Sequence, residues 1–569
     1  MKGEPPGLSV LATTKANEPP GTALGDGASR RHNSAPGWPA DFAGIHQSSF
    51  PAGWLQEATS VSSVVCGGTC GRFDITLCQP KPARSPVFMS VATLPACRSD
   101  HLAEPGWPTK GARAHLVGVC GSGMKGLAQL LFQQGWRITG SDLSPLAESL
   151  RSLPGFRFFQ GHTAAHLPPD IEMLIHSAAI GPENPERVAA RERGVPQFSY
   201  SQMLGRLMAN RDGVCIAGTH GKSTTTAMTA SILEEGGWQP SAIFGADLRS
   251  NGRSSWSGRG DLFVTESCEF QRSFLDLTPQ HAMILSVEPD HFDCYRSRDE
   301  LQGAFAEFAA RVAPTGLLLV RAEDDSAMAA GRETPATVLT FGLTDESDWC
   351  AADIRPNGFG SRFRLFRRGQ YVTEILLNVP GRHNVLNALA AAALCAELGV
   401  PTAAIRSSLS DFAGLKRRFD VLGSWRGVTL IDDYAHHPTA VATTLQTARE
   451  LYGRRRIWAA FQPHQVSRTR ALMPDFARSF RLADQAVIAP VYAARETVSD
   501  EPLQLAEELA AQINDFGPPA LACSSLDQLA EVLDDGLRPG DVLLTMGAGD
   551  IHRIHYACSR RIQRHSAAG

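Results

Sequence analysis

Residues 218–224 read Gly-Thr-His-Gly-Lys-Ser-Thr and lie between an apolar stretch and a helix-forming stretch. A glycine turn that ends in Lys and Ser at the start of a helix is typical of a phosphate-binding loop. Backbone N–H groups would surround the phosphate oxygens, Lys222 would reach the β- and γ-phosphates, and the Ser223 hydroxyl would bind Mg²⁺. The loop is shorter than the general GxxxxGKS pattern and matches it in part. The candidate nucleotide-binding residues are Gly218, Thr219, His220, Gly221, Lys222, Ser223 and Thr224.

Two acidic clusters follow this loop. Residues 262–270 predict a strand that ends at Glu266, with Glu269 three residues on. Residues 282–295 predict another strand, which ends among Glu288, Asp290, His291 and Asp293. Acids at the carboxyl ends of parallel strands face the ligand crevice, and Mg²⁺ prefers oxygen ligands. A single acid or histidine is more often solvated or structural, but the shared position favours Glu266 and His291.

A second glycine loop, GVCGSGMKG at residues 118–126, lies between an apolar strand and an apolar helix. The next strand ends at Asp142, which suits a ribose or base contact. Such a βαβ unit predicts a site for a pyrophosphate, from either a nicotinamide cofactor or a uridine nucleotide. The alternative is tight helix–strand packing without a ligand. The candidate residues in the loop are Gly121, Ser122, Gly123 and Met124.

The last third of the chain carries polar side chains at strand ends and helix starts. Asn384 and Asn387 are one turn apart at the start of a predicted helix, where they could face one ligand or cap the helix. A basic run ends at Arg418, next to a predicted strand. Two histidine-bearing loops after strands would meet at one crevice; zinc is an alternative there, but adjacent imidazoles are poor joint ligands. The first of these loops contains Asp432, Asp433, Tyr434, His436 and His437, and the second contains His464, Ser467 and Arg468.

The repeated strand–loop–helix units predict an α/β protein of three domains, each with a mainly parallel sheet. We expect a Rossmann-like domain at 113–212, a P-loop ATPase-like central domain at 213–415 and a Rossmann-like domain at 416–569. Residues 1–112 hold 13 of the 36 prolines and no persistent period, so we expect a disordered extension there. Of its four cysteines only Cys66 and Cys70 are closely spaced, which disfavours a zinc cluster.

The composition excludes several classes of protein. The chain has 569 residues, of which 43% are hydrophobic and 20% charged, and its net charge is −4. These values are typical of a globular protein and give no general affinity for nucleic acid. No apolar run is long enough to span a membrane, and no export signal is evident, so we expect a cytoplasmic protein. Twelve cysteines are too few for a disulfide framework.

Taken together, the motifs resemble those of the Mur ligases, and among them the alanine-adding branch. The matching strings run in the family's order from about residue 114 to 551. They are GSGMKGLA, GTHGKSTTT, TESCEFQRSFL, VEPDHFDCY, GRHNVLNALAA, LKRRFD, DDYAHHPT and FQPHQVSRT.

The resemblance implies a role for each matching residue. Lys222 and its loop would bind ATP; Ser223 and Glu266 would hold one Mg²⁺, and His291 a second. Asn384 and Asn387 would contact adenine. The first glycine loop and Asp142 would hold the sugar nucleotide. From the third domain, Arg418 and Asp433 would complete the ATP site, whereas Tyr434, His436, His464 and Arg468 would line the amino-acid site. Asp433 and His436 are the candidate bases.

The implied reaction joins L-alanine to the lactyl carboxylate of UDP-N-acetylmuramate through an acyl phosphate and uses ATP and Mg²⁺. We expect the protein to be a monomer or a homodimer. The alternative within the family is the ligase that recycles murein tripeptide. A folylpolyglutamate synthase-like ligase would lack the first glycine loop, and a nicotinamide oxidoreductase leaves the phosphate loop unexplained. A non-catalytic nucleotide-binding regulator would lack the metal ligands. The chain departs from the family pattern at Lys125, Ser223, Cys268 and Gln465.

Overall fold

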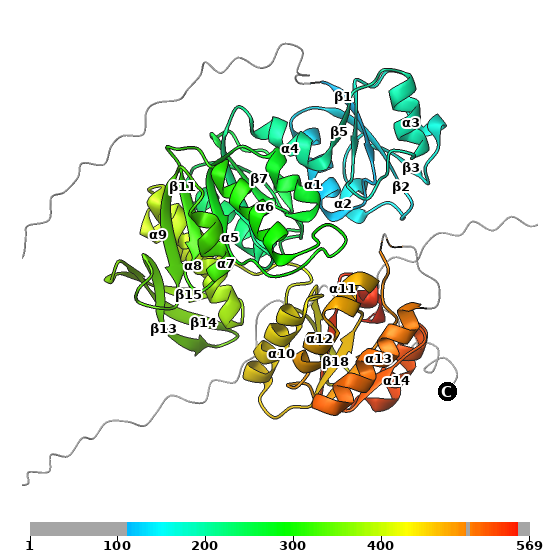
Figure 1. The fold of residues 1–569 in the computed structure, drawn as a ribbon, viewed down its shortest axis with the longest axis vertical. Helices are drawn as coiled ribbons and strands as arrows, with labels where there is room; N and C mark the ends of the chain where they lie inside the picture. The colour runs from blue at the N-terminus through cyan, green and yellow to red at the C-terminus, as the bar shows by residue number, and fades with distance from the viewer. Residues whose placement is uncertain (1–110, 495, 497–500, 556–569) are drawn as a thin grey trace, which may run out of the picture. The chain divides into compact units, whose positions relative to one another are not determined.

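The computed structural model describes residues 111–494, 496 and 501–555 (Figure 1). The first domain of this part is built on a parallel sheet. Within that part, this first sheet has five strands in the order β3-β2-β1-β4-β5. Its strands are β1 (Arg113–Val117), β2 (Arg137–Asp142), β3 (Arg157–Gln160), β4 (Met173–His176) and β5 (Gln197–Ser199). Its helices are α1 (Ser122–Gln133), α2 (Glu148–Arg151), α3 (Pro185–Glu192) and α4 (Tyr200–Met208).

The central sheet has ten strands among the described residues, in the order β15-β14-β13-β12-β11-β10-β6-β9-β7-β8. Its middle is parallel and buried on both faces, because α5 (Lys222–Glu235) and α6 (Arg298–Ala310) follow its strands. The strands of this middle are β6 (Asp212–Ala217), β7 (Ser241–Ile243), β9 (Leu262–Ser267), β10 (Pro279–Ile284), β11 (Leu317–Arg321) and β12 (Thr337–Gly342). Strand β8 (Ser255–Trp256) pairs antiparallel with β7 at one edge.

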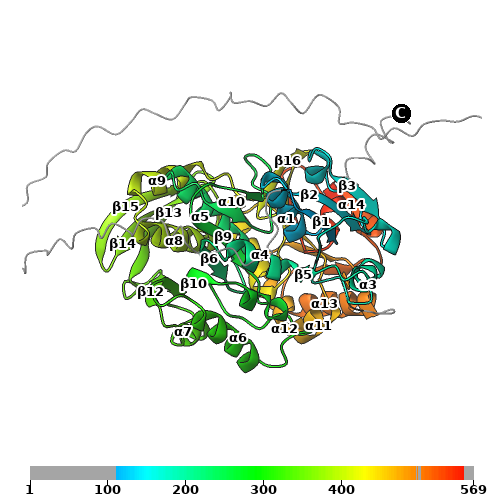
Figure 2. The ribbon, with the colours of Figure 1, turned by 90° about the horizontal axis from the view of Figure 1, so that it is seen from above.

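An antiparallel ribbon extends the other edge of the central sheet. It consists of β13 (Trp349–Asn357), β14 (Gly360–Arg367) and β15 (Gln370–Leu377). Inward apolar side chains alternate with exposed arginines along β14, as the period-two pattern of that segment requires. Helices α8 (Arg382–Glu397) and α9 (Thr402–Asp411) lie beside this ribbon in both views (Figures 1 and 2). The alanine-rich α8 packs closely against α5 and so fixes the helix that carries the phosphate loop.

The third sheet has six strands within the described ranges, in the order β16-β17-β21-β18-β19-β20. They are β16 (Asp420–Trp425), β17 (Val428–Asp433), β18 (Ile457–Phe461), β19 (Gln485–Ile488), β20 (Ala520–Ala522) and β21 (Val542–Met546). All neighbours pair in parallel except the edge strand β16. The helices are α10 (Pro438–Tyr452), α11 (Val466–Ala471), α12 (Met473–Ser479), α13 (Glu501–Phe516) and α14 (Leu526–Gly536).

These sheets confirm the predicted fold class of three α/β domains with mainly parallel sheets. Two predicted strand ends differ from the structure. Strand β10 stops at Ile284, four residues before Glu288, and Asp433 is the last residue of β17 because it still pairs with Met546 of β21. The predicted disorder and cysteines of residues 1–110 lie outside the described residues. Over the described ranges, no helix has the length and apolar character needed to cross a membrane.

Candidate functional site

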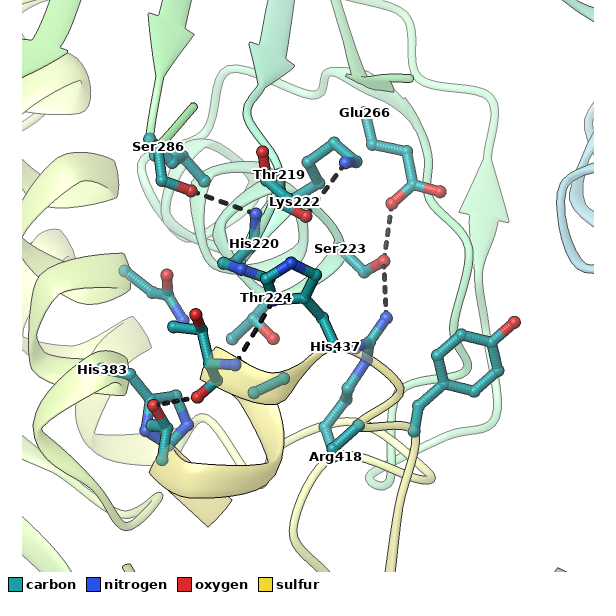
Figure 3. Close-up of a pocket in the computed structure, with 18 of the residues that line it drawn as sticks. Thr219, His220, Lys222, Ser223, Thr224, Glu266, Ser286, His383, Arg418 and His437 are labelled. Atoms are coloured by element: carbon teal, nitrogen blue, oxygen red, sulfur yellow. Dashed lines mark hydrogen bonds between the residues drawn. The ribbon is translucent and has the colours of Figure 1, made fainter. Parts of the chain in front are cut away.

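One cavity of about 450 Å³ is lined by residues from all three domains. Figure 3 shows the part of it that lies between the phosphate loop and the third domain. It collects most of the residues that the sequence singles out: Ser122, Gly123, Thr219, His220, Gly221, Lys222, Ser223, Thr224, Glu266, His291, Asn384, Asn387, Arg418, Asp433, Tyr434 and His436. The other candidates lie outside its lining: Gly121, Met124, Asp142, Gly218, His464 and Arg468.

The phosphate loop packs closely against Leu285, Ser286 and Asn387, which leaves no room for side chains at its glycines. Gly218 and Gly221 have φ values of +132° and +82°, a region that favours glycine. A Cβ at Gly221 would lie 2.4 Å from Oδ1 of Asn387. Ser286 fixes the loop from the side, because its carbonyl and hydroxyl oxygens accept the N–H groups of Thr219 and His220 at 2.8 and 3.1 Å. The first N–H groups of α5, which have no partner within the helix, then remain for an anion.

Lys222, the first residue of α5, is paired with a carboxylate. Its Nζ lies 2.9 and 3.1 Å from the two carboxylate oxygens of Glu269 and donates to the carbonyl of Gly218 at 2.5 Å. Burial alone would lower the pKa of Lys222, but Glu269 raises it above the ordinary value. The ammonium group is therefore charged and kept beside the loop.

Ser223 and Glu266 form an oxygen pair at the same end of α5. The Ser223 hydroxyl donates to Oε2 of Glu266 at 2.6 Å, and Arg418 from the third domain reaches the same hydroxyl at 3.5 Å (Figure 3). A hydroxyl and a carboxylate beside a phosphate loop are the donor set that Mg²⁺ prefers. This pair fits the predicted metal ligands.

His291 follows Asp290 in the loop after β10 and has a positive φ of 53°. Its Nε2 lies 3.7 Å from Oε1 of Glu269, and its Nδ1 is buried without a hydrogen bond. Burial lowers the pKa of His291, against the attraction of Asp290 and Glu269. The imidazole is therefore neutral, as a metal ligand must be.

Asn384 and Asn387 are buried and bonded to each other at the start of α8. Nδ2 of Asn387 donates to Oδ1 of Asn384 at 3.1 Å, and Oδ1 of Asn387 accepts from Thr225 of α5 at 3.2 Å. Nδ2 of Asn384 donates to the carbonyl of Pro380 at 2.7 Å. These contacts brace the phosphate loop; the contact with adenine stays a prediction.

Asp433 organises two backbone segments of the third domain. Its Oδ2 accepts the N–H of Phe419 at 2.6 Å, and its Oδ1 accepts the N–H of Ala435 at 2.7 Å. Burial raises the pKa of Asp433, although the charge of Arg418 and these hydrogen bonds oppose the rise. Because Phe419 follows Arg418 directly, Asp433 fixes the loop that brings Arg418 to Ser223.

Three aromatic side chains and an arginine gather where the amino-acid site is predicted. Nδ1 of His436 donates to the carbonyl of Tyr434 at 2.8 Å, and the His436 ring packs edge-to-face on Tyr434 and His464. Burial lowers the pKa of His436 well below its ordinary value, and Arg468 lowers it further. Arg468 itself donates from Nη1 to the carbonyl of His464 at 3.0 Å.

The first glycine loop is tied to the strand that follows it. Oδ2 of Asp142 accepts the N–H of Cys120 at 2.8 Å, so this carboxylate shapes the loop in the structure. A Cβ at Gly123 would lie 2.8 Å from Cζ of Tyr200. The side chain of Met124 is only 3% exposed and packs in the core, which leaves its backbone N–H as the group able to meet a ligand.

Three acidic cavity residues, to which the sequence alone assigns no individual role, hold other side chains in place. Glu269 pairs with Lys222, Asp290 pairs with Arg468, and Glu288 meets His437 of the third domain. Their positions after strands of the central sheet indicate that they lie near the site, but their partners come from distant segments of the chain. Spacing along the chain could not identify those partners.

Comparison with known proteins gives matches over most of the described region. Models of the Mur ligase family catalytic domain, the Mur ligase middle domain and the Mur ligase glutamate ligase domain match residues 113–212, 216–395 and 417–549. A UDP-N-acetylmuramate–L-alanine ligase of Desulfitobacterium hafniense is 40% identical over 452 residues, which are 77% of this chain and 98% of the relative. The corresponding ligase of Acidithiobacillus ferrooxidans is 40% identical over 447 residues, 77% of this chain and 95% of the relative.

Two solved structures are also similar. A UDP-N-acetylmuramate-alanine ligase, MurC, of Thermotoga maritima superimposes with a TM-score of 0.68 and 28% identity, over 80% of this chain and all of that one. A murein peptide ligase of Psychrobacter arcticus gives a TM-score of 0.63 and 26% identity, over 79% of this chain and 98% of that one.

Proposed function

Because the chain belongs to the Mur ligase family, we propose that it joins L-alanine to the lactyl carboxylate of UDP-N-acetylmuramate with ATP, in peptidoglycan precursor synthesis. The observation that carries this proposal is the cavity that the first glycine loop, the phosphate loop and the third-domain histidine loop line together. A reaction of three substrates needs such a meeting point, since proximity supplies much of the rate.

ATP binds to the middle domain, with its phosphates on the loop before α5. Lys222 moves from Glu269 to the β- and γ-phosphates, and the N–H groups at the start of α5 donate to phosphate oxygens. Arg418 lies beside Ser223 and adds positive charge from the third domain. These groups stabilise the charge that develops on the transferred phosphoryl group.

Ser223 and Glu266 would hold one Mg²⁺, and His291 would hold a second. The bound ions would supply further neutralisation of the phosphate charge. The first glycine loop binds the diphosphate of the sugar nucleotide. Its residues Ser122 and Gly123 line the cavity, so the bound diphosphate lies at the cavity wall.

The chemistry follows from the poor leaving ability of a carboxylate oxygen. A lactyl carboxylate oxygen attacks the γ-phosphorus, the bond to the β-phosphate oxygen breaks, and ADP leaves. The alanine amine then attacks the acyl carbon, the bond from carbon to the phosphate oxygen breaks, and inorganic phosphate leaves.

His436 is the base that the geometry favours for the amine proton. Its Nδ1 faces a carbonyl, which can only accept, so that nitrogen carries the proton and Nε2 keeps a lone pair. Both oxygens of Asp433 already accept backbone N–H groups. The attacking nitrogen becomes strongly acidic once its bond to carbon forms, so a base with a lowered pKa suffices.

Murein tripeptide is the second candidate substrate, because the similar structure from Psychrobacter arcticus is a murein peptide ligase. Phosphate release by purified protein decides between the two, with ATP, Mg²⁺ and UDP-N-acetylmuramate and each amino compound added separately. Release that needs both the sugar nucleotide and L-alanine is the expected result. Release with murein tripeptide and not with alanine would assign the recycling reaction, and release with neither would reject both.

A further inference from the structure

Three side chains of types that bind metals meet at the cavity wall, and none of them is among the Mg²⁺ ligands described above. His220 lies in the phosphate loop, and Glu288 lies in the loop after β10. His437 directly precedes α10 of the third domain. Figure 3 shows the imidazoles of His220 and His437 side by side, and their ring centroids are 4.8 Å apart. Glu288 and His437 have no part in the reaction proposed above.

Two distances between their ligand atoms match the edges of a coordination tetrahedron, and all three ligand atoms lie within 4.8 Å of one another. Oε2 of Glu288 lies 3.3 Å from Nε2 of His220 and 3.6 Å from Nδ1 of His437. A tetrahedral Zn²⁺ with bonds of about 2.0–2.2 Å separates neighbouring ligand atoms by about 3.3–3.6 Å. Nε2 of His220 is buried and makes no hydrogen bond, although it lies next to the carboxylate. Its orientation therefore suits a shared cation better than a direct hydrogen bond.

The outer contacts orient the ligands in the manner of metal sites. Nε2 of His437 donates to the carbonyl of Pro289 at 3.2 Å, which leaves the lone pair on Nδ1. Nδ1 accepts the N–H of Thr439 at 3.3 Å as the N-cap of α10, and a metal bound at Nδ1 would take the place of this hydrogen bond. The Thr439 hydroxyl donates to Oε2 of Glu288 at 2.6 Å. A carbonyl behind a histidine and a donor behind a carboxylate are the usual second layer around a bound metal.

The donor types of the group favour one class of metal ion. Two imidazoles and one carboxylate favour Zn²⁺ over Mg²⁺, which prefers oxygen ligands.

We propose that His220, Glu288 and His437 form a Zn²⁺ site between the phosphate loop and the third domain, with its fourth position open to the cavity. A metal there ties the phosphate loop to α10 and excludes ATP phosphates from the loop. This second consequence rests on the proposed ATP-dependent function; the metal site itself does not.

Titration of the full-length, chelator-treated protein with Co²⁺ tests the site directly. The expected result is one equivalent of Co²⁺ with the intense visible bands of tetrahedral coordination, displaced by Zn²⁺. His437→Gln and Glu288→Gln should each weaken Zn²⁺ binding by about 10-fold or more, the loss usual for a ligand or its support. His437→Cys should keep tight binding and add a thiolate charge-transfer band, which shows that the position itself ligates.

Cys268→Ser is the matched control, because Cys268, Glu269 and His291 form another group of potential ligands in the same cavity. Its Co²⁺ spectrum and Zn²⁺ affinity should equal those of the unmodified protein. Equal affinity in His437→Gln, loss of binding in Cys268→Ser, or an octahedral Co²⁺ spectrum would each overturn the proposal.

The exclusion of ATP is tested by the KM for MgATP at buffered free Zn²⁺. Zn²⁺ should raise this KM in the unmodified protein and leave it unchanged in His437→Gln. An equal rise of the KM for MgATP in the unmodified protein and in His437→Gln would show that the site does not exclude ATP phosphates from the loop. Failure of ligase activity with Co²⁺ binding intact would reject the proposed function and leave the metal site standing.

Discussion

Asp290 of the central domain and Arg468 of the third domain form a buried ion pair. Nε of Arg468 donates to Oδ1 of Asp290 at 2.6 Å, and the two side chains are 2% and 6% exposed. Burial would raise the pKa of Asp290, but Arg468 holds it far below the ordinary value. Because Asp290 precedes His291, this pair couples the predicted amino-acid site to the predicted metal ligand.

Arg468→Ala is expected to raise the KM for L-alanine by about 10-fold or more, since a charged hydrogen bond contributes about 1.5–3 kcal/mol. It should also lower the free energy of unfolding by about 3–5 kcal/mol, because Asp290 is left buried without its partner. The double variant Arg468→Ala/Asp290→Asn separates the effects: it should regain stability and keep the raised KM. An unchanged KM in the single variant would contradict the role of Arg468 in binding alanine.

Lys222→Ala should lower kcat by at least about 100-fold, the loss typical of one charge-stabilising group. Glu269→Gln is the control, because it releases the lysine without removing it. That variant should retain turnover, with the KM for ATP altered. Phosphate release under saturating substrates measures both, and an unchanged kcat in Lys222→Ala would refute the assigned role.

Glu266→Gln should raise the Mg²⁺ concentration needed for half-maximal activity, because an amide oxygen is a weaker ligand than a carboxylate. Ser223→Thr keeps a hydroxyl at the same position and should show the ordinary Mg²⁺ dependence. A chelator should abolish phosphate release in every variant. Identical Mg²⁺ curves for Glu266→Gln and the unmodified protein would remove Glu266 from the metal site.

Asp433→Asn should raise the KM for ATP by about 5-fold or more, because an amide N–H₂ cannot accept the N–H of Phe419 or Ala435 and a lost buried bond costs about 1–3 kcal/mol. Arg418→Ala should produce a similar rise if Asp433 acts by holding the Arg418 loop. Additive effects in the double variant would show instead that the two residues act independently.

Acid should weaken folding through buried histidines. Burial, with the charge of His552, lowers the pKa of His555 from 6.5 to about 4. Between these values the unfolded chain binds the proton and the folded chain does not, so stability is full above 6.5 and falls as the pH drops toward 4. Comparison of Tm at about pH 7.5 and 5 should show a smaller loss for His555→Gln than for the unmodified protein. An equal loss would show that His555 does not contribute.

The sequence predicted the fold class and the family correctly, and both are confirmed. These predictions succeeded because they rest on local patterns. A buried strand followed by a glycine turn and a helix specifies its own geometry, so the loops at Gly121 and Gly221 could be placed from neighbouring residues. The roles of individual site residues remain predictions for the experiments above.

Only the tertiary structure decided which side chains share a contact. Glu269 lies 47 residues from Lys222, and Asp290 lies 178 residues from Arg468, yet each pair is in direct contact. The proposed zinc ligands also could not be found from the sequence. His436 and His437 are adjacent in the chain, but His437 lies beside Glu288, whereas His436 donates to the carbonyl of Tyr434. The sequence determined the elements through short-range periodicity and turn chemistry. Pairings between loops depend on how three sheets pack, and no local pattern encodes that packing.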